Sequence, residues 1–284
     1  MFIRHLYHKK KPRTIHFFKQ IREFLFALGH NNFSKKNGTF LIYPQFPSRK
    51  STIYQISRML KFNLVTSTFK NTTNGINFHD STFQESVQFP QGINIINKNI
   101  YDISKQRVDL IHLDVFSYNT FVDPTKYTGR CVVKSNENAV HDGVEIQCPI
   151  ETKDKSKVYQ IVIDNQEGSL FVDFRVCVMK SDIVIIYKKY KIPELRFTND
   201  TCQASIEDLS VIPDSVKKMI LLFCEKMQCD FCELDVLKDN KSGQWYIIDL
   251  NKTPYGPPAS LSKKDKKKAV EILSNGFSKI FLSQ

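Results

Sequence analysis

The most regular alternation of apolar and polar residues lies near the C-terminal end, in the stretches Phe231–Lys238 and Gln244–Leu250. A period of two predicts β-strands, and the Asp, Asn, Ser and Gly residues between the stretches favour a turn. We therefore expect an antiparallel strand pair. Since side chains two apart share a strand face, Ile247, Asp249 and Asn251 are expected to point the same way.

The predicted hairpin brings four oxygen-bearing side chains together. If its turn is a three-residue loop ending at a left-handed Gly243, Asp235 lies opposite Asp249 and Glu233 lies opposite Asn251. Like charges directly across a ladder are destabilising unless a cation lies between them. Oxygen ligands of this kind suit Mg²⁺. From the hairpin alone, a metal site and an ordinary solvated face both remain open.

The same patterns predict the other elements. Strands are expected over residues 40–44, 64–68, 93–96, 129–135, 158–164, 170–179 and 183–189, and helices over residues 53–60, 103–116, 215–227 and 269–281. Residues 69–92 are rich in Asn, Thr and Gln and are expected to be mostly loop. The strand–helix–strand order of residues 40–68 is typical of a small α/β lobe with a parallel sheet.

Composition narrows the class of protein. The 284 residues are 41% hydrophobic, which predicts a globular protein rather than a disordered one. The formal net charge of +12 favours anionic partners such as nucleotides, phosphosugars, nucleic acid or acidic membranes, without choosing among them.

Seven cysteines, an odd number, are scattered mostly through apolar stretches. They are expected to be buried thiols in a reducing compartment, so the predicted location is cytoplasmic. The single C-x-x-C pair, Cys229 and Cys232, has no second pair at zinc spacing, and we interpret it as core packing.

Residues 1–35 form a basic arm followed by an amphipathic stretch. No apolar run in the sequence approaches the ~20 residues that span a bilayer. A first helix packed on the core is the plainer interpretation, and a peripheral membrane-surface helix is the alternative. The lysine run Lys263–Lys268 before the last predicted helix is expected to be a solvated face.

Three polar positions stand out on predicted strands. Lys134 ends a strand before a polar loop, where a point charge and exposed amides can hold phosphate oxygens. Asp164 ends another strand, where it is either a ligand-binding carboxylate or an ordinary turn residue. Arg175 lies in mid-strand, where a guanidinium needs an anion, either the nearby Asp173 or a ligand's phosphate or carboxylate.

These segments, taken in order, resemble the ATP-grasp superfamily over roughly residues 120–262. The superfamily carries an acidic residue in a pattern like G-V-D, here E-L-D-V at residues 233–236. The next strand ends in E/D-x-N before a Pro/Gly-containing loop, here D-L-N at residues 249–251. The implied Mg²⁺ ligands, with Mn²⁺ as an alternative ion, are Asp235, Asp249 and Asn251. The resemblance leaves the role of Glu233 open.

The resemblance also implies an ATP site. Lys134 would hold phosphates, and the loop after it has one glycine, Gly143, where many members have several. His141 would supply a hydrogen-bond donor there, or it is an ordinary loop residue. A second nucleotide lysine is usual in the superfamily, and Lys126 is our assignment for it. The implied adenosine contacts, through the linker backbone and a ribose acid, are Gln160, Ile163 and Asp164.

The D-x-R-V pattern at residues 173–176 is similar to ATP-grasp ligases that modify ribosomal proteins with glutamate, and to glutathione synthetases. It implies that Arg175 approaches the transferred phosphoryl group. Lys189 and Asn199, with Arg196 as a further candidate, would then line the acceptor pocket. The alternative is a solvated basic cluster.

The resemblance implies an α/β fold in which two ATP-clasping antiparallel sheets follow a small α/β lobe. The expected divisions are a basic arm and helix (1–35), an N-terminal α/β lobe (36–120), and an ATP-grasp domain (121–284) with a small lobe at about 121–165, a large lobe at about 166–262 and a C-terminal helix at 263–284.

The implied activity is Mg²⁺-ATP-dependent ligation, in which a carboxylate activated as an acyl phosphate is attacked by an amine. Small-molecule carboxylates and amines are the expected partners; nucleic acid is not, and membrane contact through the basic N-terminus stays open. Three rival functions remain: a kinase for a sugar or polyol hydroxyl, a non-catalytic binder of nucleic acid or anionic membrane, and a degenerate protein that only binds nucleotide.

Overall fold

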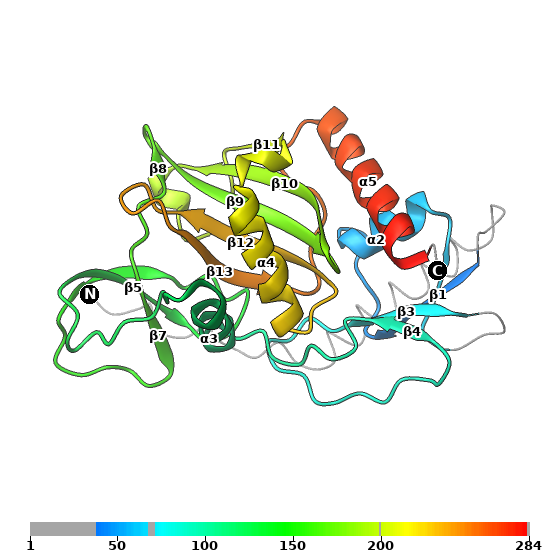
Figure 1. The fold of residues 1–284 in the computed structure, drawn as a ribbon, viewed down its shortest axis with the longest axis horizontal. Coiled ribbons are helices and arrows are strands. Elements are labelled where there is room, and N and C mark those ends of the chain that lie inside the picture. Colours follow the sequence, from blue (N-terminus) through cyan, green and yellow to red (C-terminus); the bar gives the residue numbers. More distant parts are fainter. Residues whose placement is uncertain (1–37, 68–71, 199, 283–284) are drawn as a thin grey trace, which may run out of the picture.

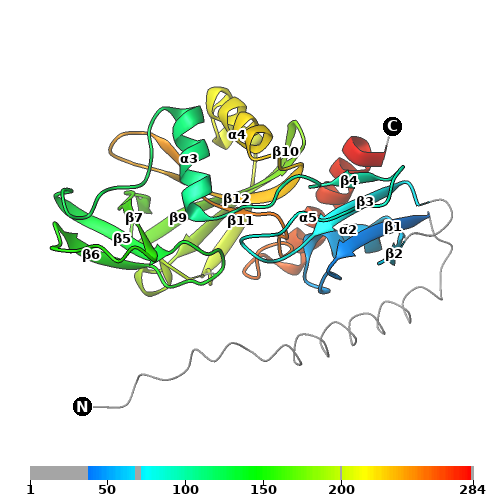
Figure 2. The same cartoon turned by 90° about the horizontal axis from the view of Figure 1, so that it is seen from below.

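The computed structural model describes residues 38–67, 72–198 and 200–282 (Figure 1). The arm and helix expected in residues 1–35, and Asn199, lie outside the described residues. Among the described helices, none is long and apolar enough to cross a membrane. Three sheets lie in a row, with the N-terminal lobe at one end, the large sheet in the middle and the small sheet at the other end (Figure 2).

The N-terminal lobe is a parallel sheet in the order β2-β1-β3-β4, with a helix packed against it. Its elements are β1 (Thr39–Pro44), α2 (Thr52–Met59), β2 (Asn63–Val65), β3 (Asn74–Phe78) and β4 (Asn94–Ile96). Phe40 pairs with Leu64 in parallel register, so the predicted strand–helix–strand unit is confirmed.

The expectation of loop over residues 69–92 is wrong for β3, which is a central strand of this sheet. Glycine is needed at Gly75 because an added Cβ would lie 2.8 Å from the Cβ of Leu41. The buried amide of Asn77 exchanges hydrogen bonds with Gln84. A strand held by close backbone approach and polar partners shows no apolar alternation, so periodicity could not reveal it.

The large sheet is antiparallel, in the order β11-β10-β9-β12-β13, and a short strand, β8, pairs with the start of β9. Its strands are β8 (Gln166–Glu167), β9 (Leu170–Met179), β10 (Asp182–Lys191), β11 (Gln203–Glu207), β12 (Phe231–Lys238) and β13 (Trp245–Asn251). The predicted bounds of β9 and β12 are confirmed residue for residue.

Helices cover both faces of the large sheet. They and three short helical turns are α3 (Lys105–Phe116), η1 (Pro193–Leu195), η2 (Leu209–Val211), α4 (Asp214–Lys226), α5 (Lys263–Phe277) and η3 (Ser278–Leu282). On one face, Val176 and Leu234 share a core with α3 and α4. On the other, Cys177 and Met179 pack against α5 and the N-terminal lobe (Figure 1). Farther along β9, this second face carries the polar residue Arg175 in place of apolar ones.

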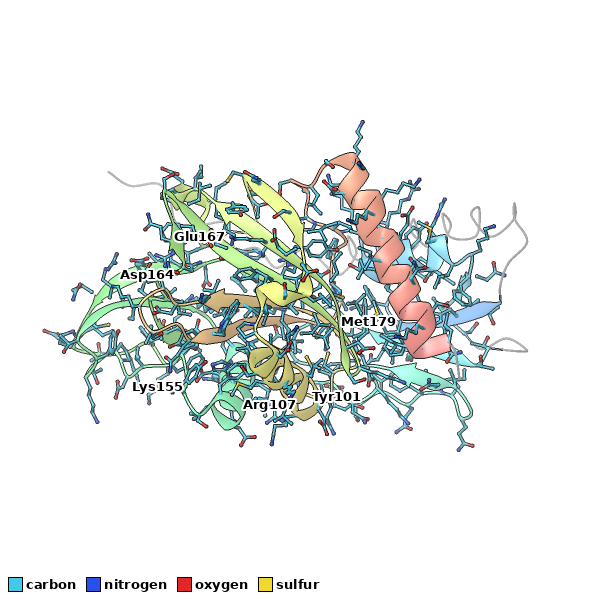
Figure 3. The ribbon with its side chains drawn as sticks, turned by 45° about the horizontal axis from the view of Figure 1, so that its top comes forward. Tyr101, Arg107, Lys155, Asp164, Glu167 and Met179 are labelled. Carbon is cyan, nitrogen blue, oxygen red and sulfur yellow. The ribbon has the colours of Figure 1, made fainter. Side chains whose placement is uncertain are left out.

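The small sheet is antiparallel, in the order β6-β5-β7. Its strands are β5 (Gly129–Ser135), β6 (Val144–Cys148) and β7 (Lys157–Ile161). Residues 162–165 link it to the large sheet, and Asp164 in this linker is labelled in Figure 3. The seven cysteines are free thiols, and only Cys202 is exposed. Cys229 and Cys232 lie in the apolar core, as we expected.

Candidate active site

A cleft separates the small sheet from the polar part of the large sheet, and it encloses about 930 Å³ of space, part of it open to solvent. β5 and β7 form one wall, β12 and β13 form the other, and the loop of residues 136–143 lies along its edge. The predicted site residues that line it are Lys134, His141, Gly143, Ile163, Asp235 and Asp249, together with the further candidate Arg196.

The pairing expected for the last two strands is confirmed. Asp235 lies opposite Asp249, and Glu233 lies opposite Asn251. Two carboxylates therefore stand directly across a ladder, an arrangement that is unfavourable without positive charge nearby.

The turn that sets this pairing differs from the expected three-residue loop. Asp239 N donates to Gln244 O at 2.8 Å, which leaves four residues between them, and Gly243 has a φ of 71°. A β-bulge at Ile248 then shifts the register by one residue and restores the predicted pairs. The expectation that Ile247 shares the carboxylate face is wrong, because the bulge places it in the apolar core while Ile248 lines the cleft.

Cross-strand register extends this row of side chains over four strands. Tyr187 pairs with Arg175, Arg175 pairs with Asp235, and Asp235 pairs with Asp249. Directly paired residues of an antiparallel sheet share a face. The predicted arginine and the two predicted carboxylates are thus neighbours, although they are up to 74 residues apart in sequence.

Asp235 already has two cationic partners. Arg175 Nε lies 3.2 Å from Oδ1, Arg175 Nη2 lies 3.4 Å from Oδ2, and Lys189 Nζ lies 2.8 Å from Oδ1. Burial alone would raise the pKa of Asp235, but Arg175 and then Lys189 outweigh it and hold the pKa well below its ordinary value. Asp235 is therefore ionised at any physiological pH.

Asp249 and Glu233 are less well satisfied. Oδ1 of Asp249 and both carboxylate oxygens of Glu233 are buried without a hydrogen-bond partner among the described residues. Burial raises the pKa of Asp249 to about 6 and that of Glu233 to about 7. Buried acceptor oxygens without donors are costly, and a bound cation is one way to satisfy them.

The residues fit the Mg²⁺ that the sequence analysis predicts. The orphaned oxygen of Asp249 stands beside Asp235, and the Asn251 side chain follows on the same strand, where its Oδ1 accepts from Thr253 N at 2.9 Å. In the described part of the chain, no group of three or more His, Cys, Asp or Glu side chains is placed to hold a metal ion. A cation here would therefore need the Asn251 amide and water in addition to the two carboxylates.

Two lysines border the other side of the cleft. Burial, aided by the charge of Lys105, lowers the pKa of Lys134 to about 8. Lys105 begins α3, is 8% exposed, and donates to the Glu137 carbonyl. Lys126 is exposed and does not line the cleft, so Lys105, not Lys126, is the second lysine there. A lysine in the first turn of a helix opposes the helix dipole, and this was the sequence signal that could have identified it.

In the loop over the cleft, two residues other than glycine have a left-handed backbone conformation. Ala139 has a φ of 58° and His141 a φ of 56°, values that cost L-residues on the order of 1 kcal/mol each. Burial lowers the pKa of His141. At Gly143 an added Cβ would lie 3.3 Å from the Phe197 ring. The loop therefore places strained residues where glycines are usual, and keeps its one glycine at a crowded position.

Hydrogen bonds fix both ends of this loop. Asp142 accepts from Ser135 N at 2.8 Å and pairs with Lys157 Nζ at 2.6 Å. Asn138 Nδ2 donates to the Leu250 carbonyl of β13 at 3.1 Å. The loop is thus bonded to both walls of the cleft.

Apolar side chains line the cleft beyond the charged ones. Val132 and Ile161 come from the small sheet, and Leu237 and Ile248 come from the large sheet. Val132 is two residues from Lys134 on β5, and Leu237 is two residues from Asp235 on β12, so each shares a face with its charged neighbour. Both walls of the cleft therefore carry apolar side chains next to the charged ones.

Two predicted adenosine contacts do not bring their side chains to the cleft. Gln160 is buried and donates to Thr120 Oγ1 at 2.6 Å. Asp164 borders a separate hollow beside Arg130 and Lys241. Only main-chain contacts from this linker strand remain as candidates, with Ile163 lining the cleft.

Arg196 lies at the linker. Its guanidinium hydrogen-bonds to Glu145 of β6, donates to the Ile163 carbonyl at 2.9 Å, and lies 4.1 Å from the centre of the Phe171 ring on β9. It thereby connects the small sheet, the linker and the large sheet. The sequence assigned it to the acceptor pocket and missed this bridging position.

Neither of the other two predicted acceptor residues is found among the described side chains that line the cleft. Lys189 is 3% exposed and lies beneath the cleft with Asp235, while Asn199 lies outside the described residues. Lys191, which the sequence did not single out, lines the cleft and pairs with Asp173 at 2.7 Å. Asn165 also lines it and donates to Asp173 at 3.1 Å.

Comparisons with known proteins bear on the fold. The sequence matches no protein-family model, and no curated protein matches it. Among solved structures, D-alanine–D-alanine ligase from Bacillus anthracis complexed with ATP matches at a TM-score of 0.51 and 16% identity, over 86% of this chain and 97% of that chain. The macrocyclase MdnC from Microcystis aeruginosa, bound with precursor peptide MdnA, matches at 0.46 and 10% identity over 84% and 99%.

A third structure is the ATP-grasp ligase PsnB complexed with a phosphomimetic variant of a minimal precursor, Mg and ADP. It matches at a TM-score of 0.41 and 12% identity over 64% of this chain, and this chain spans 62% of its length. The predicted α/β architecture, with two antiparallel sheets facing a cleft behind a parallel N-terminal lobe, is confirmed. From its likeness to the B. anthracis ligase and this arrangement of sheets, the chain has the ATP-grasp fold.

Proposed function

We propose that this protein is a Mg²⁺-ATP-dependent ligase that activates a carboxylate as an acyl phosphate for attack by an amine. One observation carries the proposal. Asp235 and Asp249 stand side by side next to Arg175, and Lys134 faces the same cleft. One buried oxygen of Asp249 has no donor among the described residues. Anionic phosphates, a divalent cation and a transferring phosphoryl group would satisfy all of these charges together.

The nucleotide would lie along the cleft. The purine ring would lie between the apolar side chains of the two sheets, and the phosphates would contact Lys105, Lys134 and the amides of the loop of residues 136–143. Asp235, Asp249 and Asn251 would hold Mg²⁺, which offsets charge on the β- and γ-phosphates.

In the chemical step, a carboxylate oxygen of the substrate bonds to the γ-phosphorus as the bond to ADP breaks. The amine then bonds to the acyl carbon and loses a proton as inorganic phosphate leaves. Arg175 and Lys189, which both pair with Asp235, would stabilise the transferring charge electrostatically. Ligation is favoured over phosphorylation of a hydroxyl because the structure that this chain resembles at a TM-score of 0.51 is a ligase.

The test is hydroxylamine trapping with the full chain, Mg²⁺, ATP and pools of carboxylates, with ADP release followed in parallel. We expect hydroxamate from at least one carboxylate. Lys134→Ala should raise the KM for ATP at least about tenfold. The matched control Lys126→Ala, an exposed lysine outside the cleft, should leave it unchanged. ADP release with phosphate transferred to a polyol, and no hydroxamate, would identify a kinase instead.

A further inference from the structure

Glu233 is a buried carboxylate for which the proposed reaction has no use. It lies on β12 between Cys177 and Asn251 in cross-strand register and is 2% exposed. Neither of its oxygens has a hydrogen-bond partner among the described residues. It does not line the cleft, so any function must pass through a neighbouring side chain.

The neighbour is Arg175. Its Nε lies 3.7 Å from Glu233 Oε2, too far for a hydrogen bond but close enough for an ion pair. The same guanidinium holds Asp235 at 3.2 and 3.4 Å, longer than the ~2.7–2.9 Å of a strong charge-assisted bond. Arg175 therefore stands between two carboxylates without closing fully on either.

A cation at Asp235 would disturb this arrangement. The lone pairs that a divalent ion needs are those that Arg175 and Lys189 now occupy, and like charges repel at this range. For the ion to bind, the guanidinium must withdraw. Leaving it buried and unpaired would be strongly unfavourable, so a second carboxylate within reach removes an obstacle to metal binding.

We propose that Glu233 is a positioning residue. When a divalent cation binds Asp235, the guanidinium of Arg175 moves away from Asp235 and pairs with Glu233. The inference rests on the proposed function. A movement of the guanidinium by about 1 Å would shorten its distance to Glu233 from 3.7 Å to that of a hydrogen bond. The exchange keeps Arg175 charged and paired.

The test measures Mn²⁺ binding by electron paramagnetic resonance, in the presence of a non-hydrolysable ATP analogue, for the full chain and its variants. Glu233→Gln keeps the size but removes the charge, so Arg175 stays on Asp235. We expect a Kd for Mn²⁺ about tenfold higher and a lower kcat, with the KM for ATP little changed. Glu167→Gln, which neutralises a half-exposed acid paired with Lys188, is the control and should bind Mn²⁺ like the parent.

Glu233→Asp separates contact from mere charge. It keeps the negative charge but shortens the side chain by one methylene, out of reach of Arg175. If Glu233 acts by contact, the shorter acid does not restore the affinity, and Glu233→Asp binds Mn²⁺ as weakly as Glu233→Gln. Rescue by Asp would mean that only the field of the charge matters, and the inference would be overturned.

The proposed function and the inference fail differently. If the parent protein binds no Mn²⁺, or if Asp249→Asn binds it as well as the parent, the proposed metal site is wrong. If Asp249→Asn abolishes binding while both folded Glu233 variants bind like the parent, only the role of Glu233 is wrong. Thermal melts establish which variants are folded.

Discussion

At the scale of single residues, Asp249 is held in an unfavourable position. One of its oxygens is buried without a donor in the described part of the chain, and Asp235 lies directly opposite. Asp249→Asn removes both the buried charge and the repulsion, so we expect the free energy of unfolding to rise by about 1–2 kcal/mol while turnover falls at least about 100-fold. Urea unfolding and ADP release measure the two effects.

Another acid in the same hairpin serves as the comparison. Asp239 accepts from the backbone amides of Asp164, Lys241 and Ser242, so Asp239→Asn should lower stability by about 1 kcal/mol. If Asp249→Asn is as destabilising as Asp239→Asn, the carboxylate of Asp249 is not strained.

His112 gives a prediction about pH. It is completely buried, stacks on Phe116 at 4.3 Å, and neither ring nitrogen has a partner among the described residues. Burial lowers its pKa to about 4. Between pH 6.5, the ordinary pKa of histidine, and pH 4, the unfolded chain binds a proton that the folded chain does not. The free energy of unfolding therefore decreases as the pH is lowered, by up to ~1.4 kcal/mol per pH unit.

The variant His112→Phe keeps the aromatic packing and cannot titrate. It should remove this component of the slope between pH 6.5 and 4, as measured by urea unfolding at a series of pH values. His79→Gln, at a half-exposed histidine, is the control and should keep the slope. An identical slope in His112→Phe would contradict the prediction.

At the scale of elements, one side chain joins the end of β4 to the start of β12. Asn97 Oδ1 accepts from the amides of Asp230 and Phe231 at 2.9 and 2.8 Å, and Nδ2 donates to the Phe231 carbonyl at 2.7 Å. Asn97→Ala should lower the free energy of unfolding by roughly 3 kcal/mol, because buried backbone groups lose their partners.

The left-handed backbone of Asn97, with a φ of 59°, adds to that cost in Asn97→Ala. Asn97→Gly removes the same side chain without this strain, so it should be less destabilising than Ala by about 1 kcal/mol. Asn94→Ala, an exposed neighbour on β4, should have little effect. Equal losses for Gly and Ala would show that backbone strain plays no part.

Elements with regular alternation could be predicted from sequence, and those governed by geometry could not. The strands β9 and β12 followed from period-two patterns of apolar and polar residues. β3 escaped because Gly75 is there for close packing, and the bulge at Ile248 has no composition signal. The acidic pair was nevertheless predicted correctly, because the four-residue turn shifts the pairing of the strands by one residue and the bulge at Ile248 shifts it back.

The site shows the same division. Lys134, Asp235 and Asp249 were predicted to be site residues, and the structure places all three at one cleft. Lys105 reaches it only because α3 packs on β13 and α4, a tertiary contact that no local pattern announces.

At the scale of the whole molecule, we expect the N-terminal charge and the site to be separate. Residues 1–37 contain nine Lys or Arg and one Glu, and among the described residues the cleft is lined from β5, β7, β12 and β13. Removing residues 1–37 would lower the net charge from +12 to about +4 at neutral pH. We expect the truncated protein to keep its affinity for ATP and to lose binding to vesicles rich in anionic lipid, measured by co-sedimentation. Loss of ATP binding would contradict this separation.

The Arg196 bridge has a kinetic consequence. Parting the two sheets must break its contacts with Glu145, Ile163 and Phe171 together. Arg196→Ala should therefore increase both the association and the dissociation rate constants of a fluorescent ATP analogue in stopped-flow measurements. Each should change by a larger factor than the Kd does. Arg130→Ala, which removes the exposed partner of the same Glu145, should leave both rates as they are. The residence time of the nucleotide would then depend on one guanidinium that holds the two walls of the cleft together.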